Sequence, residues 1–255
     1  MRFARDVACA VAIASPAWAQ APTVAPRTIL AIGAHAGDME LTAGAVLIKQ
    51  RQLGDRIVLL HMTLGERGHP KMSEELYSAQ KRREAEAAAR VIGAEVIFAP
   101  WHDGELPNDE TTRRYVADVI RRVKPSLVIT HWKESIHRDH SATHAIVEDA
   151  VLLAAIKSGE NGEGPHRGTR LWYAENWEDA AGFDRYIYID VSGMMPKYRE
   201  LVTSYEFVGG KISSFAYLDY YTALATVRGA ESRKAQAVAF DIDASGKRRV
   251  LDSVP

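Results

Sequence analysis

Two short segments of this sequence concentrate histidines and carboxylates. The first reads Gly33-Ala-His-Ala-Gly-Asp-Met-Glu40, and the second reads His131-Trp-Lys-Glu-Ser-Ile-His-Arg-Asp-His140. Imidazole nitrogens and a short carboxylate from two loops can bind one divalent cation and leave positions open for water, as a catalytic zinc site requires. Two histidines with one carboxylate also suit Fe(II), so the ligand types alone do not decide the metal. The pattern predicts a metal centre if the fold brings the two segments together.

Short apolar strands and amphipathic helices alternate along the chain and determine where these segments lie. Six strands are expected, at Thr28–Ala34, Arg56–Thr63, Glu95–Ala99, Ser126–His131, Leu171–Ala174 and Tyr186–Asp190. Six helices are expected, at Glu40–Leu53, Ser73–Ile92, Thr111–Val123, Ser141–Ile156, Met195–Tyr205 and Ser213–Arg228. This alternation predicts a single Rossmann-like α/β domain whose mostly parallel sheet has helices on both faces.

The expected strand order, 3-2-1-4-5, makes the first and fourth strands neighbours. In such a sheet, ligands bind beyond the carboxyl ends of the strands, at the point where the strand order reverses. The two histidine-rich segments follow those two strands. We therefore expect them to converge on one site.

The composition is that of a globular protein. The 255 residues are 47% hydrophobic and 25% charged, which suits one folded domain. The 32 basic and 33 acidic side chains nearly balance, so nucleic acid is not an expected partner. The sequence also lacks the G-x-G-x-x-G and G-x-S-x-G motifs of dinucleotide-binding enzymes and serine hydrolases.

The N-terminal region has the pattern of a secretory signal peptide. Residues 1–19 contain a basic start, an apolar stretch at Val7–Ala14 and a small-residue cleavage site that ends at Ala19. We expect cleavage after Ala19, export to the periplasm or the extracellular space, and no stable membrane insertion of the remaining domain, residues 20–255. The single cysteine, Cys9, would be removed, so the mature chain would use neither disulfides nor thiolate ligands.

The two segments resemble the PIG-L/LmbE-like zinc-dependent N-deacetylases. The resemblance rests on Ala34-His35-x-x-Asp38-x-Glu40 after the first strand and on His137-x-Asp139-His140 after the fourth. Further similarity lies in Thr63-Leu-Gly-Glu-Arg-Gly68, in Asp103-Gly104 and in the C-terminal third, so it covers most of the mature chain. The resemblance implies a hydrolase that removes an N-acyl group, with N-acetyl as the expected case, from a substrate containing an amino sugar.

The resemblance also implies roles for individual residues. His35, Asp38 and His140 would hold the zinc ion, which polarises the amide carbonyl and lowers the pKa of a bound water. His137 would be the cationic partner that stabilises the oxyanion and protonates the leaving amine. Asp139 would orient His137, as acid catalysis by an imidazole requires.

The chain departs from the family pattern at the general base. The family has Pro and then Asp where this sequence has Ala36 and Gly37, and the loss of a general base typically costs about 10²–10⁴-fold in rate. Three interpretations stay open. Another carboxylate, Glu66 or Glu40, replaces the base; metal-bound hydroxide alone carries a slower reaction; or the chain binds a glycan without cleaving it.

The substrate contacts are less specific. The resemblance suggests Asp103 and Lys81, a lysine where the family has an arginine, and position in the loops suggests Arg67 and Trp132. A solvated basic helix face at Lys81 and core packing at Trp132 are the alternatives. The expected partner is a small-molecule or glycan amide, and a zinc amidase acting on a non-sugar amide is the remaining alternative. The sequence does not decide the oligomeric state.

Overall fold

The computed structural model describes residues 25–157, 163–178 and 181–248, so the expected signal peptide lies outside the described residues. The described chain forms one seven-stranded sheet with the order β3-β2-β1-β4-β5-β7-β6. Its strands are β1 Thr28–Gly33, β2 Arg56–His61, β3 Glu95–Phe98, β4 Leu127–Thr130, β5 Arg170–Ala174, β6 Ile187–Asp190 and β7 Ala237–Ile242. Strands β1 to β5 pair in parallel, whereas β7 runs antiparallel to both β5 and β6.

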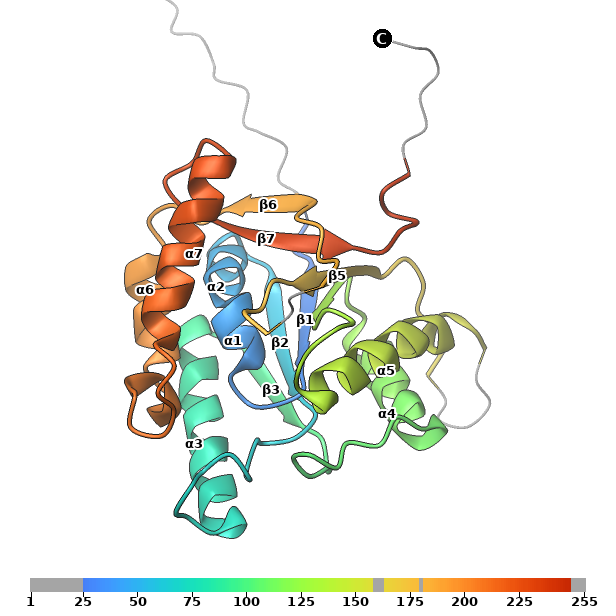
Figure 1. Cartoon of the computed structure of the whole chain (residues 1–255). Helices are drawn as coiled ribbons and strands as arrows, with labels where there is room; N and C mark the ends of the chain where they lie inside the picture. Colours follow the sequence, from blue (N-terminus) through green and yellow to red (C-terminus); the bar gives the residue numbers. More distant parts are fainter. Residues whose placement is uncertain (1–24, 158–162, 179–180, 249–255) are drawn as a thin grey trace, which may run out of the picture.

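Helices cover both faces of the sheet. They are α1 Asp38–Thr42, α2 Gly44–Gln52, α3 Glu74–Ile92, α4 Glu110–Val123, α5 Arg138–Ala155, α6 Met195–Val202 and α7 Tyr217–Glu231, with a 3₁₀ turn η1 at Glu206–Gly209. Figure 1 shows α4 and α5 together on one face, and α1, α2, α3, α6 and α7 on the other.

Alternate residues of the central strands point into two separate apolar cores, one on each face of the sheet. In β1, Ile29 and Ala31 belong to the core under α2, α3 and α6, whereas Leu30 and Ile32 belong to the core under α4 and α5. A parallel sheet that is covered on both faces needs such a continuous apolar run rather than a polar alternation. The sheet is therefore fixed from both sides, and only its strand ends are free to carry polar groups.

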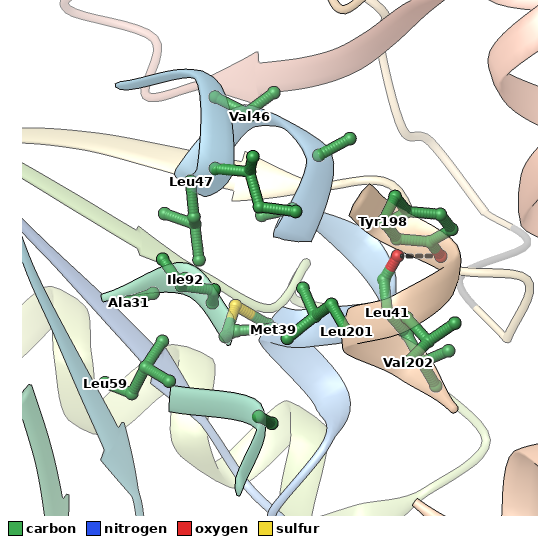
Figure 2. Packing of buried hydrophobic residues seen from close by; sticks show 14 of the residues in the cluster. Ala31, Met39, Leu41, Val46, Leu47, Leu59, Ile92, Tyr198, Leu201 and Val202 are labelled. Carbon is green, nitrogen blue, oxygen red and sulfur yellow. Dashed lines mark hydrogen bonds between the residues drawn. The ribbon is translucent and has the colours of Figure 1, made fainter. Parts of the chain in front are cut away.

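The helix that carries one candidate metal ligand is anchored by α6. Figure 2 shows Tyr198 and Leu201 of α6 against α1 and α2, with the Tyr198 hydroxyl donating a hydrogen bond of 2.8 Å to the carbonyl of Leu41. A Cβ atom at Gly44 would lie 2.6 Å from Leu201 Cδ2, so this close approach requires glycine. The packing holds α1, and with it Asp38, against the end of β1.

The expected parallel order 3-2-1-4-5 is confirmed, but several elements differ from expectation, including α6 and α7, which end at Val202 and begin at Tyr217, respectively. The expected helix 40–53 is two helices, because the chain bends at Ala43, whose φ is −118°. The final strand β7 was not expected, since a six-residue apolar stretch behind a helix has no distinctive periodicity. Helix α5 begins at Arg138 rather than Ser141, because His137 caps it. Among the described residues, no helix has the length and apolar character to cross a bilayer.

Candidate active site

The loops after the neighbouring strands β1 and β4 bring His35, Asp38 and His140 together. His35 Nδ1 lies 3.2 Å from His140 Nε2, and Asp38 Oδ2 lies 3.4 Å from each of these two nitrogens. Two ligands of a tetrahedral zinc ion, each at about 2.0–2.1 Å, are separated by about 3.3–3.4 Å. The three atoms, here called the ligand triangle, therefore fit one divalent cation, and the expected convergence of the two segments is observed.

The outer nitrogens of the two triangle histidines face carboxylates. His35 Nε2 lies 3.1 Å from Asp103 Oδ1 and 3.6 Å from Asp139 Oδ2, while His140 Nδ1 lies 3.2 Å from Glu178 Oε2. A proton held on each outer nitrogen leaves a lone pair on the inner one. Carboxylate–histidine pairs of this kind orient metal-binding imidazoles and raise their basicity. The site thus places carboxylates behind both imidazoles, as the surroundings of a metal centre do.

The electrostatics of the site also favour a cation. Burial lowers the pKa of His35, but the carboxylates of Asp38, Asp103 and Asp139 outweigh it and raise this pKa well above its usual value. Burial raises the pKa of Asp38, but His140 and His35 outweigh it and keep this pKa well below its usual range. The carboxylates therefore stay ionised and attract positive charge to the triangle.

Other groups of potential ligands overlap with the triangle. They are His35, His137 and His140; Asp38, His131 and His140; and His35, Asp103 and Asp139. The fully buried His131 has its pKa lowered to about 4 by burial and by His140, so it is a neutral group beside Asp38. Its Nε2 accepts a 3.0 Å hydrogen bond from the backbone N–H of Ala34, which connects it to the loop between β1 and α1.

His137 stands at the first turn of α5 beside the triangle. Its ring centroid lies 4.5 Å from that of His35 and 5.0 Å from that of His140. The backbone N–H of Asp139 donates to His137 Nδ1 over 3.3 Å, so the neutral ring carries its proton on Nε2. Because His137 lines the cavity described below, it can donate a hydrogen bond to a ligand there.

The carboxylate of Asp139 supports His35 and not the ring of His137. Asp139 Oδ2 accepts a 2.6 Å hydrogen bond from the backbone N–H of Gly104 and faces His35 Nε2. Only the backbone of Asp139 contacts the His137 ring through a hydrogen bond. The orienting contact expected from the Asp139 side chain is therefore made by its main chain.

Neither of the expected substitute bases lines the cavity. Glu66 Oε1 accepts a 3.2 Å hydrogen bond from the backbone N–H of Asp103 and lies 3.0 Å from His102 Nδ1, which joins the loops after β2 and β3. Glu40 is completely buried, and its Oε1 accepts a 2.5 Å hydrogen bond from the Tyr205 hydroxyl. Both carboxylates are engaged in holding loops and helices together.

A cavity of about 530 Å³ opens in front of the triangle. One wall is polar and carries Asp38, Asp103, His137, His140 and Glu178. The cavity also has an aromatic lining, here called the aromatic wall, which consists of Tyr77, Trp177, Phe207, Tyr217 and Tyr221. A cleft with an apolar wall and a few convergent polar groups is the usual form of a small-molecule site.

Sequence reasoning missed Glu178 and most of the aromatic wall. Glu178 comes four residues after β5, the strand next to β4, so its place at the same sheet edge was a usable signal. Phe207 and Tyr217 belong to the C-terminal third, which reaches the site only because α6, η1 and α7 fold back over α1 and α3. No local pattern in the sequence predicts that these elements pack against α1 and α3.

The aromatic wall fills the space beside Gly37. This glycine has φ +112°, and a Cβ atom on it would lie 3.0 Å from Cζ and 3.1 Å from Cε1 of Phe207. An aspartate at this position would have a strained backbone, and the Phe207 ring would have to shift by a few tenths of an ångström to make room for its Cβ atom. The position at which the resemblance places a general base therefore has the ring of Phe207 beside it.

The expected substrate contacts divide between the cavity and other places. Asp103 and Lys81 line the cavity. Arg67 is about one third exposed and pairs with Glu74 and Glu105 at the surface. Trp132 is buried in the core under α4 and α5, and its indole N–H donates to the carbonyl of Ala181. Of the two alternatives weighed above, core packing describes Trp132, whereas Lys81 is buried rather than solvated.

The fold and the site define an α/β protein with a candidate metal centre at the carboxyl ends of parallel strands. Residues 30–151 match the family described as PIG-L: GlcNAc-PI de-N-acetylase, so this chain carries a PIG-L family domain.

Two curated relatives and one solved structure illustrate the range of similar proteins. The chain is 29% identical over 145 residues to 4-oxalmesaconate hydratase of Pseudomonas putida, covering 54% of this chain and 56% of that protein. It is 29% identical over 176 residues to 1D-myo-inositol 2-acetamido-2-deoxy-alpha-D-glucopyranoside deacetylase of Thermomonospora curvata, covering 57% and 59%. The matches thus span less than two thirds of these relatives.

The fold extends beyond these sequence matches. The crystal structure of GalB, the 4-carboxy-2-hydroxymuconate hydratase from Pseudomonas putida KT2440, superimposes with a TM-score of 0.78 at 21% identity. It covers 90% of this chain and 100% of that chain. The similarity confirms a single α/β fold of this type.

Proposed function

We propose that this protein is a metal-dependent hydrolase that removes an N-acyl group, N-acetyl in the simplest case, from a substrate containing an amino sugar. The observation that carries the proposal is the ligand triangle, whose atoms are 3.2–3.4 Å apart and open onto a cavity. The similarity to a deacetylase that acts on an acetamido sugar supports the reaction class. Zinc is the proposed cation, because the triangle fits its tetrahedral geometry, although iron(II) suits the same ligands.

When bound, zinc would polarise the amide carbonyl and lower the pKa of a water. The protein residues around it divide the remaining tasks. Asp103 and Glu178 hold the two triangle histidines in the orientation that directs a lone pair inward. His137, whose Nδ1 accepts a hydrogen bond from the backbone N–H of Asp139, can donate a hydrogen bond from Nε2 to the carbonyl oxygen as negative charge develops there.

The reaction would proceed without a dedicated carboxylate base. Of the described residues that line the cavity, the carboxylates are Asp38, Asp103 and Glu178, and each lies within 3.4 Å of a triangle histidine. Their lone pairs are already directed at imidazole nitrogens. We therefore propose a rate about 10²–10⁴-fold below that of relatives with the carboxylate in place.

The test is hydrolysis by zinc-loaded protein of a panel of N-acetyl amino sugars, with released acetate and free amine as the readouts. We expect slow release that His140→Ala abolishes and that His69→Ala, a histidine outside the cavity, leaves intact. If no member of the panel releases acetate while amino sugars still bind, the chain is a glycan-binding protein instead. Release from non-sugar amides alone would identify an amidase of another specificity.

A second candidate function is the addition of water to the double bond of an unsaturated carboxylate. Hydration places the oxygen of a water molecule on one carbon of the double bond and a proton on the other, so it involves no leaving amine but needs the same activation of water. The similarity to a hydratase supports this candidate. Loss of the ultraviolet absorbance of a conjugated dicarboxylate, dependent on His140, would distinguish hydration from amide hydrolysis.

We also propose that residues 1–19 direct export of the protein, as their composition suggests.

A further inference from the structure

Lys81, on α3, is a buried ammonium group at the wall of the cavity. Lys81 is 3% exposed. Four carboxylates act on its charge, but none of the described residues forms an ion pair with it; these carboxylates belong to Glu84, Asp38, Glu40 and Asp103. Nζ donates one hydrogen bond, of 2.5 Å, to the carbonyl of Ala36. It also lies 4.4 Å and 4.6 Å from the ring centroids of Phe207 and Tyr205.

This arrangement leaves the ammonium only partly compensated. A lysine side chain has three donor hydrogens, and the one printed hydrogen bond uses one of them. The aromatic faces contribute cation–π attraction, which is smaller than a charge-assisted hydrogen bond to a carboxylate. Burial outweighs the attraction of the nearby carboxylates and lowers the pKa of Lys81 to about 8. The cavity wall therefore contains an ammonium group that forms no ion pair with a carboxylate of the described residues.

The position of Lys81 relates this cation directly to the candidate reaction centre. Its hydrogen-bond acceptor, the carbonyl of Ala36, belongs to the residue between His35 and Gly37 in the loop that connects β1 and α1. Lys81 is also the only lysine or arginine among the described residues that line the cavity. The neighbouring Arg82 does not line it and instead lies over the ring of Phe98, with 4.2 Å between the guanidinium carbon and the ring centroid.

We infer that the substrate carries a carboxylate that pairs with Lys81 while its reacting group lies at the ligand triangle. The inference rests on the proposed function and specifies its substrate class: an anionic N-acyl amino sugar. A neutral sugar would leave the buried ammonium without an ion-pair partner. A phosphate group fits less well, because phosphate sites in proteins combine several donors, commonly arginines or helix N-termini, whereas this wall offers one ammonium.

The experiment compares two matched pairs of N-acetyl amino sugars. One pair is a 2-acetamido-2-deoxyhexuronate and its uncharged uronamide, and the other is a 3-O-lactyl acetamido sugar and its uncharged lactamide. We expect wild-type kcat/KM to favour the carboxylate in at least one pair by about 10- to 100-fold, mainly through KM. Equal kcat/KM within both pairs would overturn the inference.

Variants of α3 assign the preference to one side chain. Lys81→Met should bring the ratio within the favoured pair close to one, and Lys81→Arg should keep part of it. Arg82→Met, which changes the neighbouring cation outside the cavity, should retain the wild-type ratio. A ratio that survives Lys81→Met in a folded protein, as judged by circular dichroism, would assign the preference elsewhere and overturn the inference.

Binding separates this inference from the proposed reaction. Calorimetry with the deacetylated products of the same pairs should give tighter binding of the carboxylate form, also by about tenfold or more. Tighter binding without hydrolysis of any amide would sustain the anionic specificity and refute the proposed hydrolase. Hydrolysis with equal affinity for the charged and uncharged forms would support the proposed hydrolase and refute the anionic specificity.

Discussion

The ring of Phe207 packs directly against Gly37. A Cβ atom on this glycine would lie 3.0 Å from Phe207 Cζ, and the backbone φ of +112° is one that other residues rarely adopt. We propose that Gly37 and Phe207 together leave little room for the carboxylate that the resemblance places at this position.

Restoring aspartate at residue 37 should destabilise the protein without restoring a general base. We expect Gly37→Asp to lower the free energy of unfolding by about 1–3 kcal/mol and to give no gain in activity. Gly54→Ala is the matched control for backbone strain, because Gly54 has φ +97° but no heavy atom within 4 Å of an added Cβ. Urea denaturation and acetate release measure the two effects.

Making room beside residue 37 tests the same explanation. The double variant Gly37→Asp with Phe207→Ala should hydrolyse the substrate faster than Gly37→Asp alone, because the carboxylate then has space. A gain from Gly37→Asp alone, in a protein of unchanged stability, would show that Phe207 does not exclude the side chain.

The carboxylates behind the triangle should control metal affinity. Glu178→Gln and Asp103→Asn remove the charge that orients His140 and His35, and each should weaken zinc binding by about 10- to 100-fold. Competition with a chromogenic chelator measures the affinity. Glu134→Gln, an exposed carboxylate in the loop after β4, is the control and should bind zinc as the wild type does. Unchanged affinity in both site variants would remove these residues from the metal centre.

The buried ammonium of Lys81 should lower the free energy of unfolding at neutral pH. Its pKa is lowered from 10.5 to about 8 in the native state, so between these values the unfolded chain binds the additional proton. The free energy of unfolding therefore gains a contribution that rises with pH, by about 2–3 kcal/mol between pH 8 and pH 10.

Lys81→Met should lack this contribution. The stability difference between wild type and Lys81→Met, measured by urea denaturation at pH 7 and pH 10, should shift by that amount in favour of the wild type. The exposed Lys133→Met control should show no such shift. A pH-independent difference for Lys81→Met would mean that the ammonium is charged to the same extent in both states.

The exported protein should begin at Gln20. Residues 1–19 have the three parts of a signal peptide in order, and cleavage after Ala19 removes Cys9. Mass spectrometry of the protein recovered outside the cytoplasm should give a chain without a thiol, and Ala19→Arg should block processing. An intact Met1–Pro255 chain retained in the cytoplasm would contradict the export proposal.

The sequence predicted the part of the site that depends on strand order. His35 and His140 follow strands whose apolar runs could be read directly, and the topology rules for parallel sheets place those strands side by side. The roles of Glu66 and Trp132 could not be read in the same way. Position in a loop near the site does not reveal that Glu66 binds a neighbouring backbone or that Trp132 turns into the core.

The aromatic wall depended on tertiary structure that no local signal carried. Phe207 is more than 60 positions from the second histidine-rich segment, and it reaches Gly37 because α6 packs on α1 and α2 through Tyr198 and Leu201. The burial of Lys81 follows from the same packing, since its ammonium lies against Phe207. The contact between Phe207 and Gly37 and the burial of Lys81 thus both follow from the packing of the C-terminal third.

X-ray absorption spectroscopy of the zinc-loaded protein tests the metal centre most directly. We predict one zinc ion per chain, with two imidazole nitrogens and a carboxylate oxygen at about 2.0–2.1 Å, and loss of an imidazole from the spectrum in His140→Ala. A zinc ion bound with an unaltered spectrum in both His35→Ala and His140→Ala would contradict the account, because the cation would then lie elsewhere on the molecule.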